Sequence, residues 1–244
     1  MRSSVSFFAS LFAFSALVAS VALHAQAQDQ SQSQSNTGQP AGIGTYTVVD
    51  PLAGVRYDNR FDLSVGLAYD HMKAGPTLLQ GSNLGGLDVM GSYWFSKNWA
   101  VEGSARAYYG TSGAGPNSIQ PGGIQGPVVS QYFLTAGPEW LGPHNKHGAL
   151  IAHVLVGGAY FDSHLDSLTP QDVDFYPNQV ALAAAFGGHF DLNRSAHWVF
   201  RVTPDALFTR YNANYATPTT PIGARTNWNF GISVGVEYKF KKKR

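Results

Sequence analysis

Three groups of residues have types and spacings that could support catalysis or metal binding. The segment GISVG (residues 231–235) matches the G-x-S-x-G pattern of a nucleophile elbow. That elbow needs a sharp turn from a strand into a helix, whereas Ser233 lies in the middle of an alternating, strand-like segment. We therefore expect Ser233 to be a structural residue and not a nucleophile.

The other two groups consist of residues close together in predicted loops. His164, Asp166 and Ser167 have the residue types of a catalytic triad, but a single irregular loop offers no scaffold to fix their geometry. His144 and His147 could share a metal ion, yet two ligands without a third make a poor site. The sequence therefore predicts no catalytic residue, no cofactor and no metal site.

A larger set of ionisable residues lies on the face opposite the apolar side chains in alternating segments. If this polar face lines a narrow interior, the free-energy cost of removing each charge from water must be offset by a charged partner or by bound water. We expect a structural network of ion pairs and hydrogen bonds; the alternative is that the same residues line a gated, narrow pore. The set is Asp62, Asp88, Glu102, Arg106, Glu139, His153, His189, Arg201, Asp205, Glu237 and Lys239.

The clearest of the segments that must position these residues is NWNFGISVGVEYKF (227–240). Every even-numbered position is aromatic or aliphatic, and every odd-numbered position is Asn, Gly, Ser, Glu or Lys. A strand of a soluble protein usually has about 5 or 6 residues, whereas a tilted strand that crosses a bilayer needs roughly 9 to 11. The length favours a strand between lipid and a polar interior.

Eight segments show this alternation, and the lengths of their connections follow a rule. The connections after the second, fourth and sixth segments are short, and those after the odd-numbered segments are long. Up-and-down outer-membrane barrels sort their loops in this way, whereas a Greek-key sandwich does not. We predict an all-β fold, an eight-stranded antiparallel up-and-down transmembrane β-barrel, and not a secreted calycin-like barrel with its apolar side chains inside. The segments are 60–72, 84–95, 99–109, 129–140, 149–161, 179–192, 197–210 and 227–240.

The amino terminus has the features of an export signal. Arg2 is followed by an apolar run over residues 5–23, and Ala25-Gln26-Ala27 supplies a small-x-small cleavage site. No other apolar run reaches 18 residues, so any membrane crossing must use strands. We predict a signal peptide at 1–27, a disordered or irregular leader at 28–59, the barrel at 60–240 and a basic tail at 241–244.

Short sequence pieces resemble a known family. The segments FLTAGPEW (133–140), HVLVGGAYF (153–161) and AFGGHFDL (185–192) resemble recurrent strand pieces of the OmpA-like transmembrane-domain family of small outer-membrane β-barrels. The resemblance covers 60–240 and implies a place in the bacterial outer membrane. It also implies a terminal aromatic signal for the barrel-assembly machinery, which Tyr238 and Phe240 supply, although four basic residues follow Phe240.

Barrel size and composition narrow the function. An eight-stranded barrel is just wide enough for side chains to fill it, and a formal net charge of +1 offers no basic field for nucleic acid. We expect a non-enzymatic outer-membrane protein that anchors surface loops for envelope integrity, adhesion or partner recognition. Its partners would be outer-membrane lipid, the assembly machinery and a possible external ligand at the long loops. The alternatives are a narrow ion or small-solute pore and a lipid-acting barrel enzyme, which would need a nucleophile, a His and an acid together at the outer rim.

Overall fold

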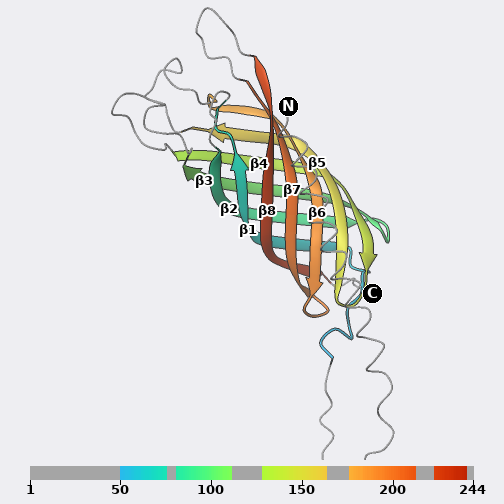
Figure 1. The fold of residues 1–244 in the computed structure, drawn as a ribbon. Helices are drawn as coiled ribbons and strands as arrows, with labels where there is room; N and C mark the ends of the chain where they lie inside the picture. Colours follow the sequence, from blue (N-terminus) through green and yellow to red (C-terminus); the bar gives the residue numbers. More distant parts are fainter. Residues whose placement is uncertain (1–49, 76–80, 112–127, 164–175, 213–222, 241–244) are drawn as a thin grey trace, which may run out of the picture. The chain divides into compact units, whose positions relative to one another are not determined.

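The described part of the chain forms one closed sheet. The computed structural model describes residues 50–75, 81–111, 128–163, 176–212 and 223–240. In these residues the strands follow one another around a barrel in chain order (Figure 1). The strands are β1 Phe61–Met72, β2 Ser82–Trp94, β3 Trp99–Thr111, β4 Val128–His144, β5 Gly148–Asp162, β6 Gln179–Asn193, β7 Trp198–Asn212 and β8 Ala224–Phe240.

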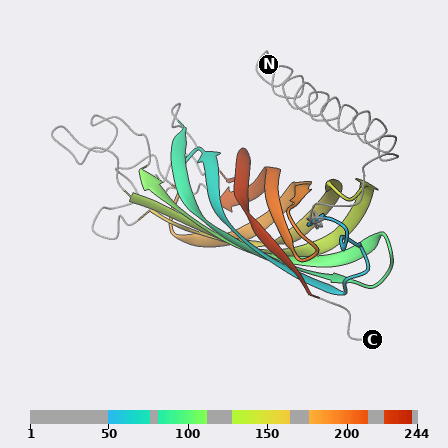
Figure 2. The same ribbon diagram turned by 90° about the horizontal axis from the view of Figure 1, so that it is seen from below.

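Closure comes from antiparallel pairing of the first strand with the last. The β1–β8 ladder runs from Phe61 opposite Phe240 to His71 opposite Phe230, and every other strand pairs antiparallel with its neighbours in the chain. Figure 2 shows the strands curving around the barrel from a second direction. The predicted eight-stranded antiparallel up-and-down barrel is therefore confirmed.

Some predictions fall outside the described residues. These are the signal peptide at 1–27, most of the leader at 28–59 and the basic tail at 241–244. Within the described part of the chain, no helix has the length and apolarity that crossing a membrane would require.

The two faces of the barrel differ in chemistry as the alternation predicted. Apolar side chains point outward, and Leu67, Leu134 and Val180 are each more than 70% exposed, with values of 71%, 73% and 76%. The neighbouring positions point inward and are buried, as Asp70 is on β1 at 0%. This arrangement is the reverse of a soluble barrel, in which apolar side chains fill the centre.

Aromatic rings cluster on the exterior toward both ends of the barrel. Toward the ends of the strands that carry the long connections, Tyr132 contacts Tyr109 and Tyr160, with ring centroids 5.5 and 6.2 Å apart. Toward the end with the short turns, Tyr238 contacts Trp198 and Phe240, each at 5.0 Å. Amphipathic rings in two belts are typical of side chains at the two interfaces of a bilayer.

One expectation about β4 is wrong. The sequence places Pro138 near the end of a strand that stops at 140, but β4 continues to His144. Because proline has no N–H to donate, the β4–β5 ladder is interrupted at Gly137 and Pro138, between the pairs formed by Ala136 and Glu139. The β6–β7 ladder has a similar interruption opposite Pro204. The barrel thus tolerates proline inside strands, and not only at their ends.

Two adjacent glycines on β5 provide a test of the close packing of the strands. A Cβ atom at Gly157 would lie 2.1 Å from the carbonyl oxygen of Leu134, whereas one at Gly158 would lie 3.7 Å from that of Ala181. We expect Gly157→Ala to lower the free energy of unfolding by about 1–3 kcal/mol through overpacking. Gly158→Ala is the matched control and should change little. Urea unfolding in detergent micelles measures both, and equal stabilities would contradict the packing seen at Gly157.

Candidate functional site: the polar interior of the barrel

All eleven ionisable residues of the predicted interior set lie inside the barrel. Each has 5% or less of its surface exposed. They come from all eight strands, because alternate side chains of each strand point inward.

Arg201 is the centre of one charged group. On β7 its guanidinium donates two hydrogen bonds to the carboxylate of Asp191 on β6, at 2.8 and 2.9 Å. It also forms an ion pair with Glu237 on β8. Bidentate arginine–carboxylate pairs are among the stronger polar contacts in proteins. Nearby, the Trp94 indole N–H donates to Asp62 at 2.6 Å, so a neutral donor partly satisfies this carboxylate.

Arg106 is the centre of a second group. From β3 it forms an ion pair with Asp205 at 2.5 Å, across the lumen on β7, and a longer one with Asp88 at 3.5 Å. Its Nε also donates to Ser104 Oγ at 3.1 Å. Asp205 thereby joins the arginine to the histidines of a third group.

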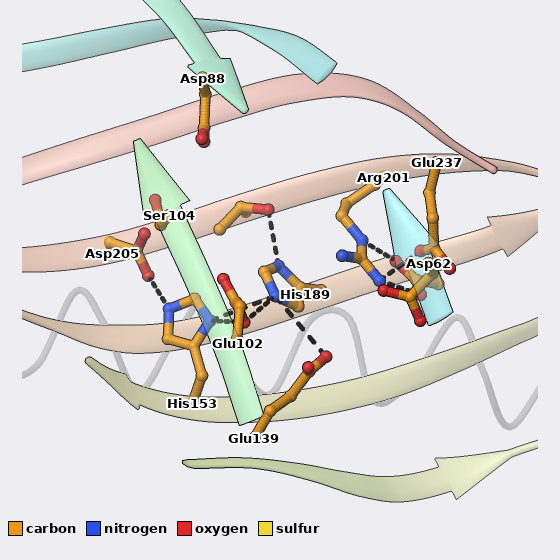
Figure 3. Close-up of polar contacts among 12 residues, drawn as sticks. Asp62, Asp88, Glu102, Ser104, Glu139, His153, His189, Arg201, Asp205 and Glu237 are labelled. Carbon is orange, nitrogen blue, oxygen red and sulfur yellow. Dashed lines mark hydrogen bonds and ion pairs between the residues drawn. The ribbon is translucent and has the colours of Figure 1, made fainter. Parts of the chain in front are cut away.

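The third group contains two histidines and a shared carboxylate (Figure 3). His153 Nε2 lies 2.8 Å from Asp205 Oδ1, and its Nδ1 lies 3.0 Å from Glu102 Oε2. His189 Nε2 lies 2.9 Å from the same Glu102 oxygen, and its Nδ1 lies 2.8 Å from Thr203 Oγ1. One oxygen of Glu102 on β3 therefore lies within hydrogen-bond distance of both imidazole rings, which come from β5 and β6.

Carboxylates outnumber arginine and lysine in this interior. Among the described residues, eight acidic side chains are buried, against Arg106, Arg201 and Lys239. Uncompensated charge is costly away from water, so some of the acids must be protonated or must be balanced by other cations. The set predicted from the sequence shows only part of this excess, because it includes neither Asp70 nor Asp191. The eight acids are Asp62, Asp70, Asp88, Glu102, Glu139, Asp191, Asp205 and Glu237.

A residue from before the first strand closes the short-turn end. The Tyr57 hydroxyl donates to the Asn145 carbonyl oxygen at 3.1 Å and accepts from Asn193 Nδ2 at 2.7 Å. Lys239 Nζ lies 4.3 Å from the centroid of the Tyr57 ring. Burial raises the pKa of Tyr57 to about 12, so its hydroxyl keeps the proton that it donates. The backbone around Tyr57 is irregular, but it is held to the barrel.

Aromatic side chains fill the interior at the end of the barrel that carries the long connections. Tyr211 accepts a hydrogen bond from Gln131 Nε2 at 2.5 Å, and its ring lies 5.3 and 5.1 Å from those of Phe161 and Tyr176. Tyr176 also donates to Asn227 Oδ1 at 3.0 Å. Sequence reasoning missed this cluster. Its inward strand positions follow from the alternation, but Tyr176 lies outside every predicted strand.

The weak catalytic motifs do not gain support from the structure. Ser233 is buried within β8 and is followed by further strand residues, so the turn of a nucleophile elbow is missing there. His144 is exposed, with its ring 4.6 Å from that of Tyr57 and its Nδ1 near the Gly142 carbonyl oxygen. The segment with His164, Asp166 and Ser167 lies outside the described residues.

Comparisons with known proteins find similarity in fold only. No family model matches the chain, and no curated protein matches it. Among solved structures, the attachment invasion locus protein Ail of Yersinia pestis is 18% identical, with a TM-score of 0.41, over 75% of this chain and 99% of that chain. The outer membrane protein OprG of Pseudomonas aeruginosa is 14% identical, with a TM-score of 0.45, over 75% and 97%. Neisserial surface protein A is 14% identical, with a TM-score of 0.41, over 74% and 97%. The specific resemblance to the OmpA-like family stays a prediction.

Arg201 offers a direct test of the charged interior. Arg201→Ala would leave Asp191 and Glu237 buried without their cation, and breaking a buried pair in this way typically costs about 3–5 kcal/mol. The matched control is Arg210→Ala, because Arg210 lies on the same strand but is exposed. Urea unfolding followed by tryptophan fluorescence should show a large loss for the first variant and a small one for the second. Similar losses would mean that the Arg201 ion pairs contribute little.

Proposed function

We propose that this protein is a non-enzymatic outer-membrane β-barrel with a filled interior, which anchors surface loops for envelope integrity, adhesion or recognition of an external partner. The observation that carries the proposal is the inversion of the two faces, with apolar side chains outside and ionisable ones inside. Monomeric soluble proteins rarely expose contiguous apolar patches larger than a few hundred Å². Here the exposed apolar residues occur on all eight strands.

Backbone hydrogen bonding supports a place within lipid. A bilayer core contains no water to satisfy free N–H and C=O groups, so a sheet can span it only as a closed barrel. The β1–β8 pairing provides that closure. The strands have 12 to 17 residues, which exceeds the roughly 9 to 11 needed for a tilted crossing. The extra residues would carry the strands past both interfaces.

The outer membrane of a bacterium is the compartment that fits the remaining features. The predicted signal peptide at 1–27 would direct export, and Tyr238 and Phe240 place aromatic rings on the outside of the last strand. These two residues are our candidates for the signal read by the barrel-assembly machinery. Outer-membrane lipid would cover the apolar face, and any external ligand would bind the long connections.

The filled interior argues against the alternative of a pore. The cavity beside Tyr57, Asp62 and Trp94 has a volume of about 10 Å³, and a second one beside Asp88 and Thr203 is equally small. A space of that size holds about one water molecule. Aromatic rings occupy the interior on the long-connection side, so ions would need large side-chain movements to pass.

The position of the histidines argues against the alternative of a lipid-acting enzyme. Such an enzyme needs a nucleophile, a base and an acid that reach lipid at the rim of the barrel. His153 and His189 are buried inside, 3% and 0% exposed, and their partners are equally buried. A lipid ester outside the barrel has no access to them.

A charge on the outer face tests the membrane assignment. Val234 lies in the middle of β8 and is 40% exposed, whereas Val128 begins β4 and is 50% exposed. If lipid surrounds the barrel, Val234→Lys should lose about 2–4 kcal/mol of stability in phospholipid vesicles, and Val128→Lys at the edge about 0–1 kcal/mol. The wild type should fractionate with outer membranes and migrate differently on gels before and after heating. A soluble product, or equal effects of the two lysines, would contradict the proposal.

Planar-bilayer recordings test the filled interior. We expect the purified, folded protein to give no steady conductance, because paired charges and aromatic rings occupy the lumen. A sustained and ion-selective current would favour the narrow pore instead. Denatured protein added at the same concentration serves as the control for detergent artefacts.

A further inference from the structure

We propose that Glu102, His153 and His189 bind a divalent transition-metal ion of the Zn²⁺ type inside the barrel. This site goes beyond the proposed function, which needs no metal. The three side chains are buried, and each offers one ligand atom to a common point. They come from β3, β5 and β6, so only the closed barrel brings them together.

The spacing of the three ligand atoms matches a metal site. Glu102 Oε2 lies 3.0 Å from His153 Nδ1 and 2.9 Å from His189 Nε2, and the two nitrogens lie 3.2 Å apart. Zinc binds nitrogen and carboxylate oxygen at about 2.0–2.2 Å, which places tetrahedral ligand atoms roughly 3.3 Å from one another. An expansion of a few tenths of an ångström would admit the ion.

The other nitrogen of each ring has the partner that a metal-binding histidine usually has. Asp205 can only accept as a carboxylate, so His153 Nε2 carries a proton and the neutral ring presents a lone pair at Nδ1. Thr203 Oγ1 can accept from His189 Nδ1, which leaves a lone pair at Nε2. Hydrogen bonds of this kind fix the tautomer and the orientation of histidine ligands. Two lone pairs and a carboxylate oxygen then converge with no proton between them.

A fourth buried group points to the same place (Figure 3). Glu139 is 0% exposed, neither of its carboxylate oxygens has a hydrogen-bond partner, and Oε1 lies 4.0 Å from His189 Nε2. Glu102 Oε1 is also without a hydrogen-bond partner. Buried polar atoms in proteins are nearly always satisfied, and a cation bound at this point would give these oxygens a partner. Glu139 could complete the coordination by a small rotation of its side chain.

The charge balance of the interior also favours a cation. Eight buried carboxylates face three arginine and lysine side chains among the described residues, and a divalent ion beside Glu102 and Glu139 would reduce that excess. Protons are the competing occupants, because a protonated His153 could donate to Glu102 and Asp205 at once. The experiment must therefore distinguish a metal from protons.

The set of ligand atoms decides the class of ion. Two imidazole nitrogens and a carboxylate oxygen suit zinc and similar transition metals, whereas Mg²⁺ and Ca²⁺ prefer ligand sets made of oxygen alone. Tyr57 on one side and the aromatic cluster on the other enclose the interior. The ion would therefore enter during folding and would have a structural role.

Refolding the full chain with and without metal provides the test. The protein is unfolded in urea with chelator, refolded into detergent micelles with Zn²⁺ or with EDTA, and freed of unbound metal. We expect about one zinc per folded chain by elemental analysis, a higher melting temperature than in EDTA, and a visible absorption spectrum when Co²⁺ replaces Zn²⁺. Wild-type protein that is folded, as judged by gel migration, but retains no zinc and shows no Co²⁺ spectrum would overturn the proposal in favour of protons.

Matched variants locate the ion. His189→Gln should abolish retention of zinc, and Thr203→Val, which removes only the partner of His189 Nδ1, should weaken binding about 10–100-fold. The control is the double variant His144→Gln/His147→Gln at the β4–β5 turn, which should still retain zinc. Equal retention by folded His189→Gln would show adventitious binding and overturn the site. Because His189→Gln could fail to fold, Thr203→Val is the second variant, and binding as tight as in the wild type by folded Thr203→Val would also overturn the site. A barrel that folds without zinc leaves the membrane assignment intact.

Discussion

The closure of the sheet between β1 and β8 is the constraint on which the rest of the structure depends. Without it, two strand edges would present unpaired N–H and C=O groups, which lipid cannot satisfy. Closure with eight strands also fixes a narrow lumen. Alternate side chains of each strand must enter that lumen, so each inward residue has to pack or pair with residues from across the barrel.

The narrow lumen makes ion pairing a requirement. Arg201 satisfies two carboxylates, and Arg106 joins Asp88 to Asp205. Removing one partner of such a pair leaves a buried charge, which costs more than the intact pair contributes. The excess of acids means that protons or bound cations belong to the folded state, and Glu139 is one of the buried acids whose two carboxylate oxygens have no hydrogen-bond partner.

The sequence predicts the strands well because alternation is a local property. The period of two assigned all eleven predicted ionisable residues to the interior, and the structure places them there. Contacts across the lumen depend instead on strand tilt and stagger, which no local pattern reveals. Glu102 and His189 are 87 residues apart, yet their side-chain atoms lie 2.9 Å apart. The role of Tyr57 was missed for another reason, since a polar, irregular segment gives no sign of a docked aromatic ring.

The aromatic cluster lies at the ends of the strands that carry the long connections. Tyr176 lies where one connection re-enters the described chain, and it is fixed by the rings of Phe161 and Tyr211 and by a hydrogen bond to Asn227. These contacts fix the chain at Tyr176, where the described residues resume after the connection. Loops on a rigid scaffold can vary without loss of the fold. The proposed function, recognition at the long connections, requires a scaffold of this kind.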